Sequence, residues 1–268
     1  AQQRSFAPLK LKASDFSGLD LAGGDFTEAE LDGANFTGAT LTGANFGRAA
    51  LAHAVLDGAC LDKASFTGAN LGLARLAGAS CAGCDFREAT WYHTTLDGAM
   101  LSGSDFSNAQ FIEVKAAKSQ WMQAKLSQAV FVKCSLPMAD FAQAAILRAS
   151  FIESDMGACN FSAAHLESTD FVTWRLDGSV FDGCSAGNVR FVHGSSLRDT
   201  SFRGSIVNNA SFRAMPLMNA NFTGANLDAS DLSEVLCQGG NFYRANLRGA
   251  LLVKGQFQNA VFAESNLM

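Results

Sequence analysis

Two cysteines, Cys81 and Cys84, stand three positions apart and form the one CxxC motif of the chain. This spacing serves thiol–disulfide exchange in oxidoreductases and supplies two of the four ligands of many zinc sites. A structural zinc site needs two further ligands of the same kind, and the sequence contains no second CxxC. Whether these thiols can do chemistry therefore depends on the element that holds them.

Other residue types common in active sites are present without forming a recognisable set. His93 and His193 occupy equivalent places in the repeat described below, roughly 24 Å apart, which is too far to share a metal ion. The Ser, Asp and Asn residues follow that repeat, and no pattern sets a nucleophile beside a base or a glycine-rich phosphate loop between a strand and a helix. We therefore expect no catalytic residues, no cofactor, no metal ion and no enzymatic activity.

A five-residue repeat organises the chain. From Phe6 to Phe191, and again from Leu197 to Leu267, a large apolar residue fills nearly every fifth position. All 22 phenylalanines fall in these positions, which we call the large slots. Two residues earlier comes a small slot, usually Ala, Ser, Thr, Cys, Gly or Val. A period of five fits neither a helix nor a long strand. It predicts a short extended segment with both slots pointing inward, followed by a corner of Gly, Asn or Asp.

The same frame decides the environment of the thiols. Cys81 occupies a large slot and Cys84 a small slot, so both are predicted to point inward and to act as compact apolar side chains. Three more cysteines fall in small slots, namely Cys134, Cys159 and Cys184. Cys60 lies between slots and is the thiol that we expect to be most exposed.

A second period of 20 residues indicates how many segments make one turn of the coil. Six triplets recur at this spacing: Trp91-Tyr92-His93, Phe111-Ile112-Glu113, Phe131-Val132-Lys133, Phe151-Ile152-Glu153, Phe171-Val172-Thr173 and Phe191-Val192-His193. In a five-residue frame, a 20-residue period predicts four segments per turn and hence a square coil.

The repeat units GANFT, GATLT, GANFG, TGANL and RANLR resemble the A-(D/N)-L-x-x motif of the pentapeptide-repeat family. The resemblance covers essentially the whole chain. It implies an all-β fold, a right-handed quadrilateral β-helix (a solenoid) with four pentapeptides per turn and about thirteen turns at the usual strand spacing. We expect a single such domain over residues 6–267, preceded by an N-terminal tail of residues 1–5 and interrupted by a one-residue insertion near residues 192–196.

Composition limits the kinds of partner. The net charge is −5, and the excess of acidic residues lies within residues 1–110, so no basic face for nucleic acid is expected. No apolar run approaches the length that spans a membrane. Seven cysteines at ordinary spacing indicate reduced thiols. They favour the reduced cytoplasm, with an exported form as the alternative.

The triplets also predict an exposed apolar ridge. The residue after each large slot should face outward, and on one wall these residues are apolar: Tyr92, Ile112, Val132, Ile152, Val172 and Val192. Beside them run Glu113, Lys133 and Glu153, whose charges alternate and could pair between coils. One interpretation is that β-branched residues simply favour strand positions. The other is that the ridge binds a partner, as contiguous apolar surface often does.

Trp174 departs from the repeat because it fills a small slot. Ala186 fills a large slot on the opposite wall of the same predicted turn. The indole therefore either points inward and fills the volume that Ala186 leaves, or turns outward and joins the ridge. We expect the inward, compensated arrangement.

Three classes of function follow. The first is a non-enzymatic scaffold that binds a protein partner of unknown identity through its exposed walls, as an accessory or domain of a bacterial secretion or envelope system. The second is implied by the family resemblance alone, a DNA mimic that binds type II topoisomerase (gyrase) and protects it from inhibitors. It needs a continuous acidic face, which the weak charge disfavours. The third is an enzyme. Open solenoid ends expose strand edges, so either two such chains associate end to end or the chain is cut from a longer protein. Lateral self-association is a further alternative.

Overall fold

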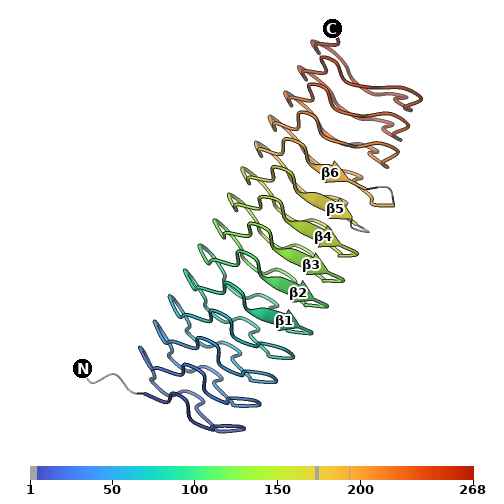
Figure 1. Ribbon diagram of the computed structural model, residues 1–268. Helices are drawn as coiled ribbons and strands as arrows, with labels where there is room; N and C mark the ends of the chain where they lie inside the picture. The colour runs from blue at the N-terminus through green and yellow to red at the C-terminus, as the bar shows by residue number, and fades with distance from the viewer. Residues whose placement is uncertain (1–4, 173–174, 193) are drawn as a thin grey trace. The chain divides into compact units, whose positions relative to one another are not determined.

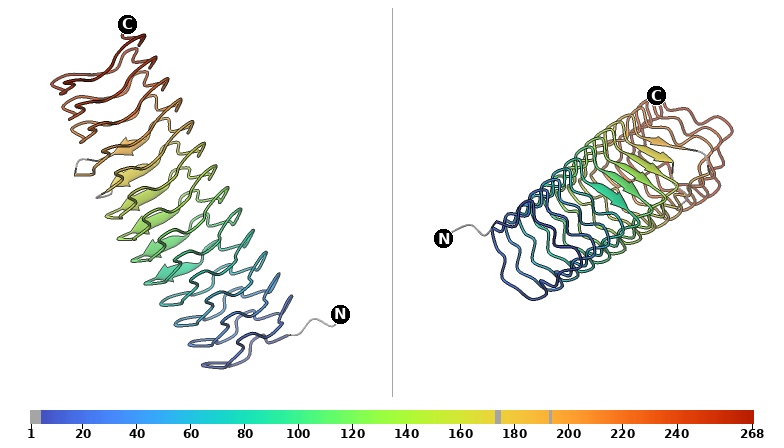
Figure 2. Two further views of the ribbon diagram at one scale, coloured as in Figure 1. Left: turned by 180° about the vertical axis from the view of Figure 1, so that it is seen from behind. Right: turned by 60° about the horizontal axis from the view of Figure 1, so that its bottom comes forward.

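The computed structural model describes residues 5–172, 175–192 and 194–268. The chain divides into two compact units, residues 1–135 and residues 136–268. In both units short extended segments alternate with tight turns, and no helix occurs in the described ranges. Successive coils lie on one another within each unit (Figure 2).

Parallel β-bridges hold these coils together. They join residues 20 positions apart and recur every five residues, as between Lys10 and Glu30 in the first unit and between Asp140 and Asn160 in the second. Each segment donates backbone hydrogen bonds to the next coil, for example from the Phe36 amide to the Val55 carbonyl at 2.7 Å. Both units are therefore parallel β-solenoids, which confirms the predicted all-β coil.

Six short strands lie where the sequence repeats its triplets. In the first unit β1 (Thr90–Tyr92), β2 (Gln110–Ile112) and β3 (Val130–Val132) are neighbours and parallel (Figure 1). In the second unit β4 (Ser150–Ile152), β5 (Asp170–Val172) and β6 (Arg190–Phe191) repeat the arrangement. Each of the strands β1–β5 ends in Tyr, Ile or Val after the large slot. Aromatic and β-branched residues favour extended backbone, so the strand continues there, whereas on other walls a turn begins.

The corners are tight turns whose third residue has a positive φ. At Leu31–Ala34 the Ala34 amide donates to the Leu31 carbonyl at 3.0 Å, and Gly33 has φ 69°. Many corners place residues with a Cβ in this conformation, among them Gln143 at 59° and Arg148 at 55°. Such residues cost about 1–2 kcal/mol each in the left-handed region. The ladders that fix each corner between two coils offset this cost, so the composition of the corners is broader than the predicted Gly, Asn and Asp.

Gly58 allows this backbone cost to be measured alone. Its φ is 64°, and an added Cβ would meet no atom within 4 Å. We therefore expect Gly58→Ala to lower the free energy of unfolding by about 1 kcal/mol. Ala158, with φ 56°, is the matched control, and Ala158→Gly should be neutral or slightly stabilising. Urea unfolding measures both. Destabilisation by both substitutions would contradict this account.

Aromatic stacks fill the interior of each coil. In the first unit the rings of Phe46 and Phe66 stack at 4.8 Å, and in the second the rings of Phe161 and Phe181 stack at 4.8 Å. Small-slot hydroxyls add buried hydrogen bonds. Ser104 Oγ, for example, donates to the Cys81 carbonyl at 2.6 Å. The large and small slots are thus the inward positions, as the frame predicts.

Among the bridges of the described residues, one stretch departs from the 20-residue spacing. Val180 pairs with Ser201 and Arg190 with Ser211, both 21 positions apart, and the spacing returns to 20 between Ser201 and Asn221. One extra residue therefore enters the coil between Arg190 and Ser201.

Candidate partner-binding surfaces

The first unit carries an apolar stripe along its three strands. Tyr92, Ile112 and Val132 pair in register across β1, β2 and β3. Tyr92 is 49% exposed and Ile112 37% exposed, while Val132 is half-buried. Leu73, which is 42% exposed, lies in the coil before β1, and its amide donates to the Tyr92 carbonyl at 2.6 Å. We call these four residues the first stripe.

Sequence reasoning missed Leu73. The prediction considered only residues directly after a large slot, and Leu73 follows Leu71 by two positions. It occupies a turn position with φ 58°, where a large apolar side chain is out of place. A large apolar residue at a turn position was therefore the feature of the sequence that could have identified Leu73.

Polar groups line one edge of the first stripe. The rings of Tyr92 and His93 meet edge to face, with centroids 4.0 Å apart. His93 Nδ1 lies 3.3 Å from Glu113 Oε2 in the next coil. Glu113 therefore has a partner, His93, in the preceding coil. The predicted pairing of Glu113 with Lys133 did not include this contact. Lys133 occupies the equivalent turn position of the following coil, with φ 54°.

The second unit carries a stripe of its own, formed by Ile152, Val172 and Val192. Ile152 and Val172 pair in register across β4 and β5. Val172 and Val192 are 37% and 38% exposed, and Ile152 is half-buried. The Val192 amide donates to the Phe171 carbonyl at 3.0 Å. We call these three residues the second stripe.

The polar borders of the second stripe are formed by residues that lie beside it in the same coils. Arg190 donates from Nε to Asp170 Oδ1 at 2.6 Å and forms a second bond through Nη2. Glu153 follows Ile152 at a turn position with φ 49°. The stripe therefore lies between an ion pair on one side and a carboxylate on the other.

Trp174 lies outside the described residues. Ala186, its predicted partner, is 1% exposed and fills its large slot. The compensation between the two side chains stays a prediction.

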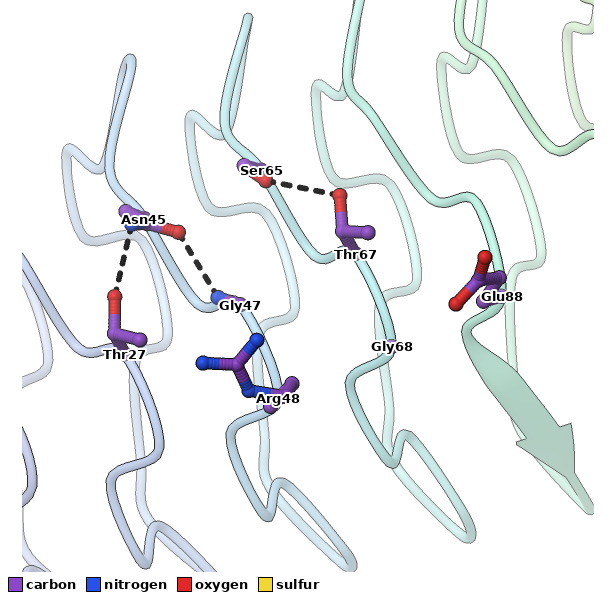
Figure 3. Close-up of a pocket in the computed structure, with 8 residues that line it drawn as sticks. All are labelled: Thr27, Asn45, Gly47, Arg48, Ser65, Thr67, Gly68 and Glu88. Atoms are coloured by element: carbon purple, nitrogen blue, oxygen red, sulfur yellow. Dashed lines mark hydrogen bonds between the residues drawn. The ribbon is translucent and has the colours of Figure 1, made fainter.

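A polar groove of about 340 Å³ lies on another wall of the first unit (Figure 3). Gly47 and Gly68 hollow it, since neither fills its position with a side chain. Asn45 donates to Thr27 Oγ1 at 2.8 Å and accepts the Gly47 amide at 3.0 Å. Arg48 extends along the groove and pairs with Glu28 at 2.6 Å. These polar groups bond to neighbouring protein groups and are not directed at a ligand. The groove therefore follows from the absence of side chains at Gly47 and Gly68.

The thiols are placed as the frame predicts. Cys81 and Cys84 are fully buried, and Cys60 is exposed. The hydrogen bond with Cys84, together with burial, raises the pKa of the Cys81 thiol well above its usual value. Since the thiolate is the reactive form, this CxxC pair is suited to packing rather than to redox or metal chemistry.

Within the described residues, no group of three or more His, Cys, Asp or Glu side chains is placed to hold a metal ion. No helix in that part of the chain has the length and apolarity that crossing a membrane requires.

Comparison with known families gives one match. The model described as pentapeptide repeats matches in eight copies, within residues 10–115, 122–162, 195–233 and 241–267. A comparison with curated proteins returned no match.

Several solved structures are similar to this chain. HetL, a pentapeptide repeat protein involved in heterocyst differentiation regulation in the cyanobacterium Nostoc sp. strain PCC 7120, is 20% identical over 98% of this chain and 91% of its own, with a TM-score of 0.24. QnrB1, a plasmid-mediated fluoroquinolone resistance protein, is 15% identical over 95% and 94%, with a TM-score of 0.26. A pentapeptide repeat protein from the Arabidopsis thaliana thylakoid lumen is 33% identical over 38% and 68%, with a TM-score of 0.21.

Proposed function

Because the chain belongs to the pentapeptide-repeat family, we propose that it is a non-enzymatic scaffold that binds a protein partner through its exposed walls. The proposal includes the finer architecture implied by the family, a single right-handed quadrilateral solenoid of about thirteen turns at the usual strand spacing. The 20-residue register of the β-bridges supports four segments per turn.

The exposed apolar stripes carry the functional proposal. Strand propensity alone would be satisfied by Thr, which is β-branched and polar. Instead, each coil from β1 to β5 places Tyr, Ile or Val at the outward position. Contiguous apolar surface with a polar border is typical of protein-interaction sites. The first and second stripes both have such borders, at the His93–Glu113 contact and at the Asp170–Arg190 ion pair.

A DNA-mimicking role is less favoured by the charges of the first unit. Such a mimic needs a continuous, uncompensated acidic face. Lys12 instead lies 3.2 Å from Glu30 and 3.3 Å from Asp32, and Arg48 neutralises Glu28. Three carboxylates near the start of the chain, those of Glu28, Glu30 and Asp32, therefore each face a basic side chain.

Lysine substitutions in the stripes test the proposal. We expect Ile112→Lys with Val132→Lys, or Ile152→Lys with Val172→Lys, to reduce capture of the wild-type partner from a cell lysate at least tenfold. Two new charges at the centre of an interface would have to be desolvated without a counter-charge. Quantitative mass spectrometry of the captured proteins measures the effect.

A matched control separates charge from position. Thr37 and Thr42 are exposed and also directly follow large slots, but on other walls. Thr37→Lys with Thr42→Lys should leave capture unchanged. An identical set of captured proteins for wild type and both stripe variants would overturn the proposal, provided that circular dichroism shows an intact fold.

A further inference from the structure

The extra residue between Arg190 and Ser201 marks the one change of register in the described bridges. Gly194 adopts φ 100° there, and the following Ser195 is 2% exposed. Insertions into solenoid repeats form loops on one face, and that face is often where ligands bind. A ligand site is therefore expected beside this loop.

A surface cavity of about 390 Å³ opens beside the loop, entirely within the second unit. Gly194, Ser195 and Ser196 form one side of it. The next two coils supply an apolar shelf made of Ala214, Pro216 and Leu236. Leu236 is 36% exposed, so the shelf is open to solvent. The remaining lining residues are Arg175, Asp177 and Arg198.

The charged groups of this cavity are not equivalent. Arg175 pairs with Asp155 at 2.8 Å. Asp177 Oδ1 accepts hydrogen bonds from Ser196 Oγ at 2.5 Å and from the Arg198 amide at 2.9 Å. In the described part of the chain, the Arg198 guanidinium forms no ion pair. The cavity thus places the Arg198 guanidinium beside an apolar shelf, while the Asp177 carboxylate, which also borders the cavity, is held by the Ser196 hydroxyl and the Arg198 amide.

Comparison with Arg203 indicates that the coil does not need the Arg198 guanidinium for its own hydrogen bonds. Its amide donates to Asp182 Oδ1 at 2.9 Å, and Ser201 Oγ also bonds to Asp182. This repeats the Asp177, Ser196 and Arg198 arrangement on the next segment. Asp and Ser hold the backbone in both places, and only Arg198 borders the cavity.

We propose that the cavity binds a peptide segment of a protein partner that carries a carboxylate next to an aliphatic side chain. The inference rests on the proposed scaffold function and names the chemistry of one partner segment. Arg198 pairs with the carboxylate, since a guanidinium fork matches a carboxylate in two parallel hydrogen bonds. The aliphatic side chain packs on Pro216 and Leu236. A cavity of this volume is within the range of small-ligand sites, which suits a short segment.

The probes are two capped tripeptides, acetyl-Leu-Glu-Leu-amide and its isosteric neutral analogue acetyl-Leu-Gln-Leu-amide. Each is titrated into the isotopically labelled full chain while the backbone amide signals of Gly194, Ser195 and Arg198 are followed by NMR. We expect saturable shifts with the Glu peptide and at least fivefold weaker binding of the Gln peptide. Arg198→Gln should remove the difference between the two peptides. Arg203→Gln, the matched control, should preserve it.

Three results would overturn the inference. They are equal binding of the two peptides to the wild type, an unchanged preference in Arg198→Gln, and acetate binding at these signals as tightly as the Glu peptide. The Ile152→Lys and Val172→Lys variant should still bind the Glu peptide. Failure of the stripes as partner sites and failure of this cavity as a carboxylate site are therefore distinguishable.

Discussion

Trp121→Ala should lower the free energy of unfolding by about 3–5 kcal/mol, the range for removing a large aromatic side chain from a core. Trp121 is fully buried in a large slot of the first unit. Its ring centroid lies 4.9 Å from that of Phe106 and 5.7 Å from that of Phe111. Its indole Nε1 donates to Ser119 Oγ at 2.6 Å. The substitution therefore removes ring contacts on two walls and leaves a buried hydroxyl without its donor.

The surrounding coil has little freedom to close this cavity. Backbone ladders fix the neighbouring segments, as the bonds from the Leu101 amide to the Gln120 carbonyl at 2.7 Å and from the Gln120 amide to the Ala99 carbonyl at 2.9 Å show. Ala116 already fills the preceding large slot with a small side chain. A residual cavity adds to the lost transfer free energy when surrounding groups cannot relax.

Urea unfolding of the wild type and of three variants, Trp121→Ala, Trp121→Phe and Tyr92→Ala, measures the effect of Trp121. Tyr92→Ala is the control, since this aromatic residue of the same unit is 49% exposed and its truncation should cost about 1 kcal/mol or less. Trp121→Phe should fall between the two, because it keeps a ring and loses the indole donor. A loss below about 1.5 kcal/mol for Trp121→Ala would show that the coil does collapse around the site.

The inward half of this molecule could be predicted from the sequence because every coil repeats one constraint. A side chain in a large or small slot meets the equivalent slots of the coils above and below, so its burial follows from its position. Cys81 and Cys84 illustrate this, since the frame alone placed both thiols inside. The outward positions of Tyr92 and Ile112 followed from the same alternation.

The remaining features depend on contacts that no single repeat encodes. Leu73 joins the first stripe because its turn brings it beside β1, which depends on the register between coils. Glu113 pairs with His93 because the two lie at equivalent turn positions of adjacent coils. The cavity at Arg198 lies beside the extra residue between Arg190 and Ser201, where Gly194, Ser195 and Ser196 face Pro216 and Leu236 of later coils. The sequence shows the one-residue insertion, but the shape of the cavity beside it depends on how the neighbouring coils pack.

Alkaline pH should destabilise the protein steeply under reducing conditions. Burial raises the pKa of Cys134, Cys159, Cys184 and Cys237 to about 12, from an ordinary value of 9.0. Between these values the native state keeps the thiol protons that the unfolded state has lost. Stability from this source is therefore fully present below pH 9 and is lost as the pH rises toward 12. Each thiol contributes about 1.4 kcal/mol per pH unit, so the four together lower the free energy of unfolding by about 5–6 kcal/mol per unit.

Substituting the thiols isolates their share of this alkaline loss. Cys134, Cys159 and Cys184 occupy small slots, where Ala is the commonest residue, so changing all three to Ala should preserve the coil. Ionisation of Lys and Tyr side chains is common to both proteins and cancels in the comparison. In urea unfolding at several pH values from about 9.5 to 10.5 with a phosphine reductant, where the unfolded thiols are mostly ionised, the triple variant should lose about 4 kcal/mol less per pH unit than the wild type. Parallel pH profiles for the two proteins would contradict the prediction, because the native coil would then admit thiolates at no cost.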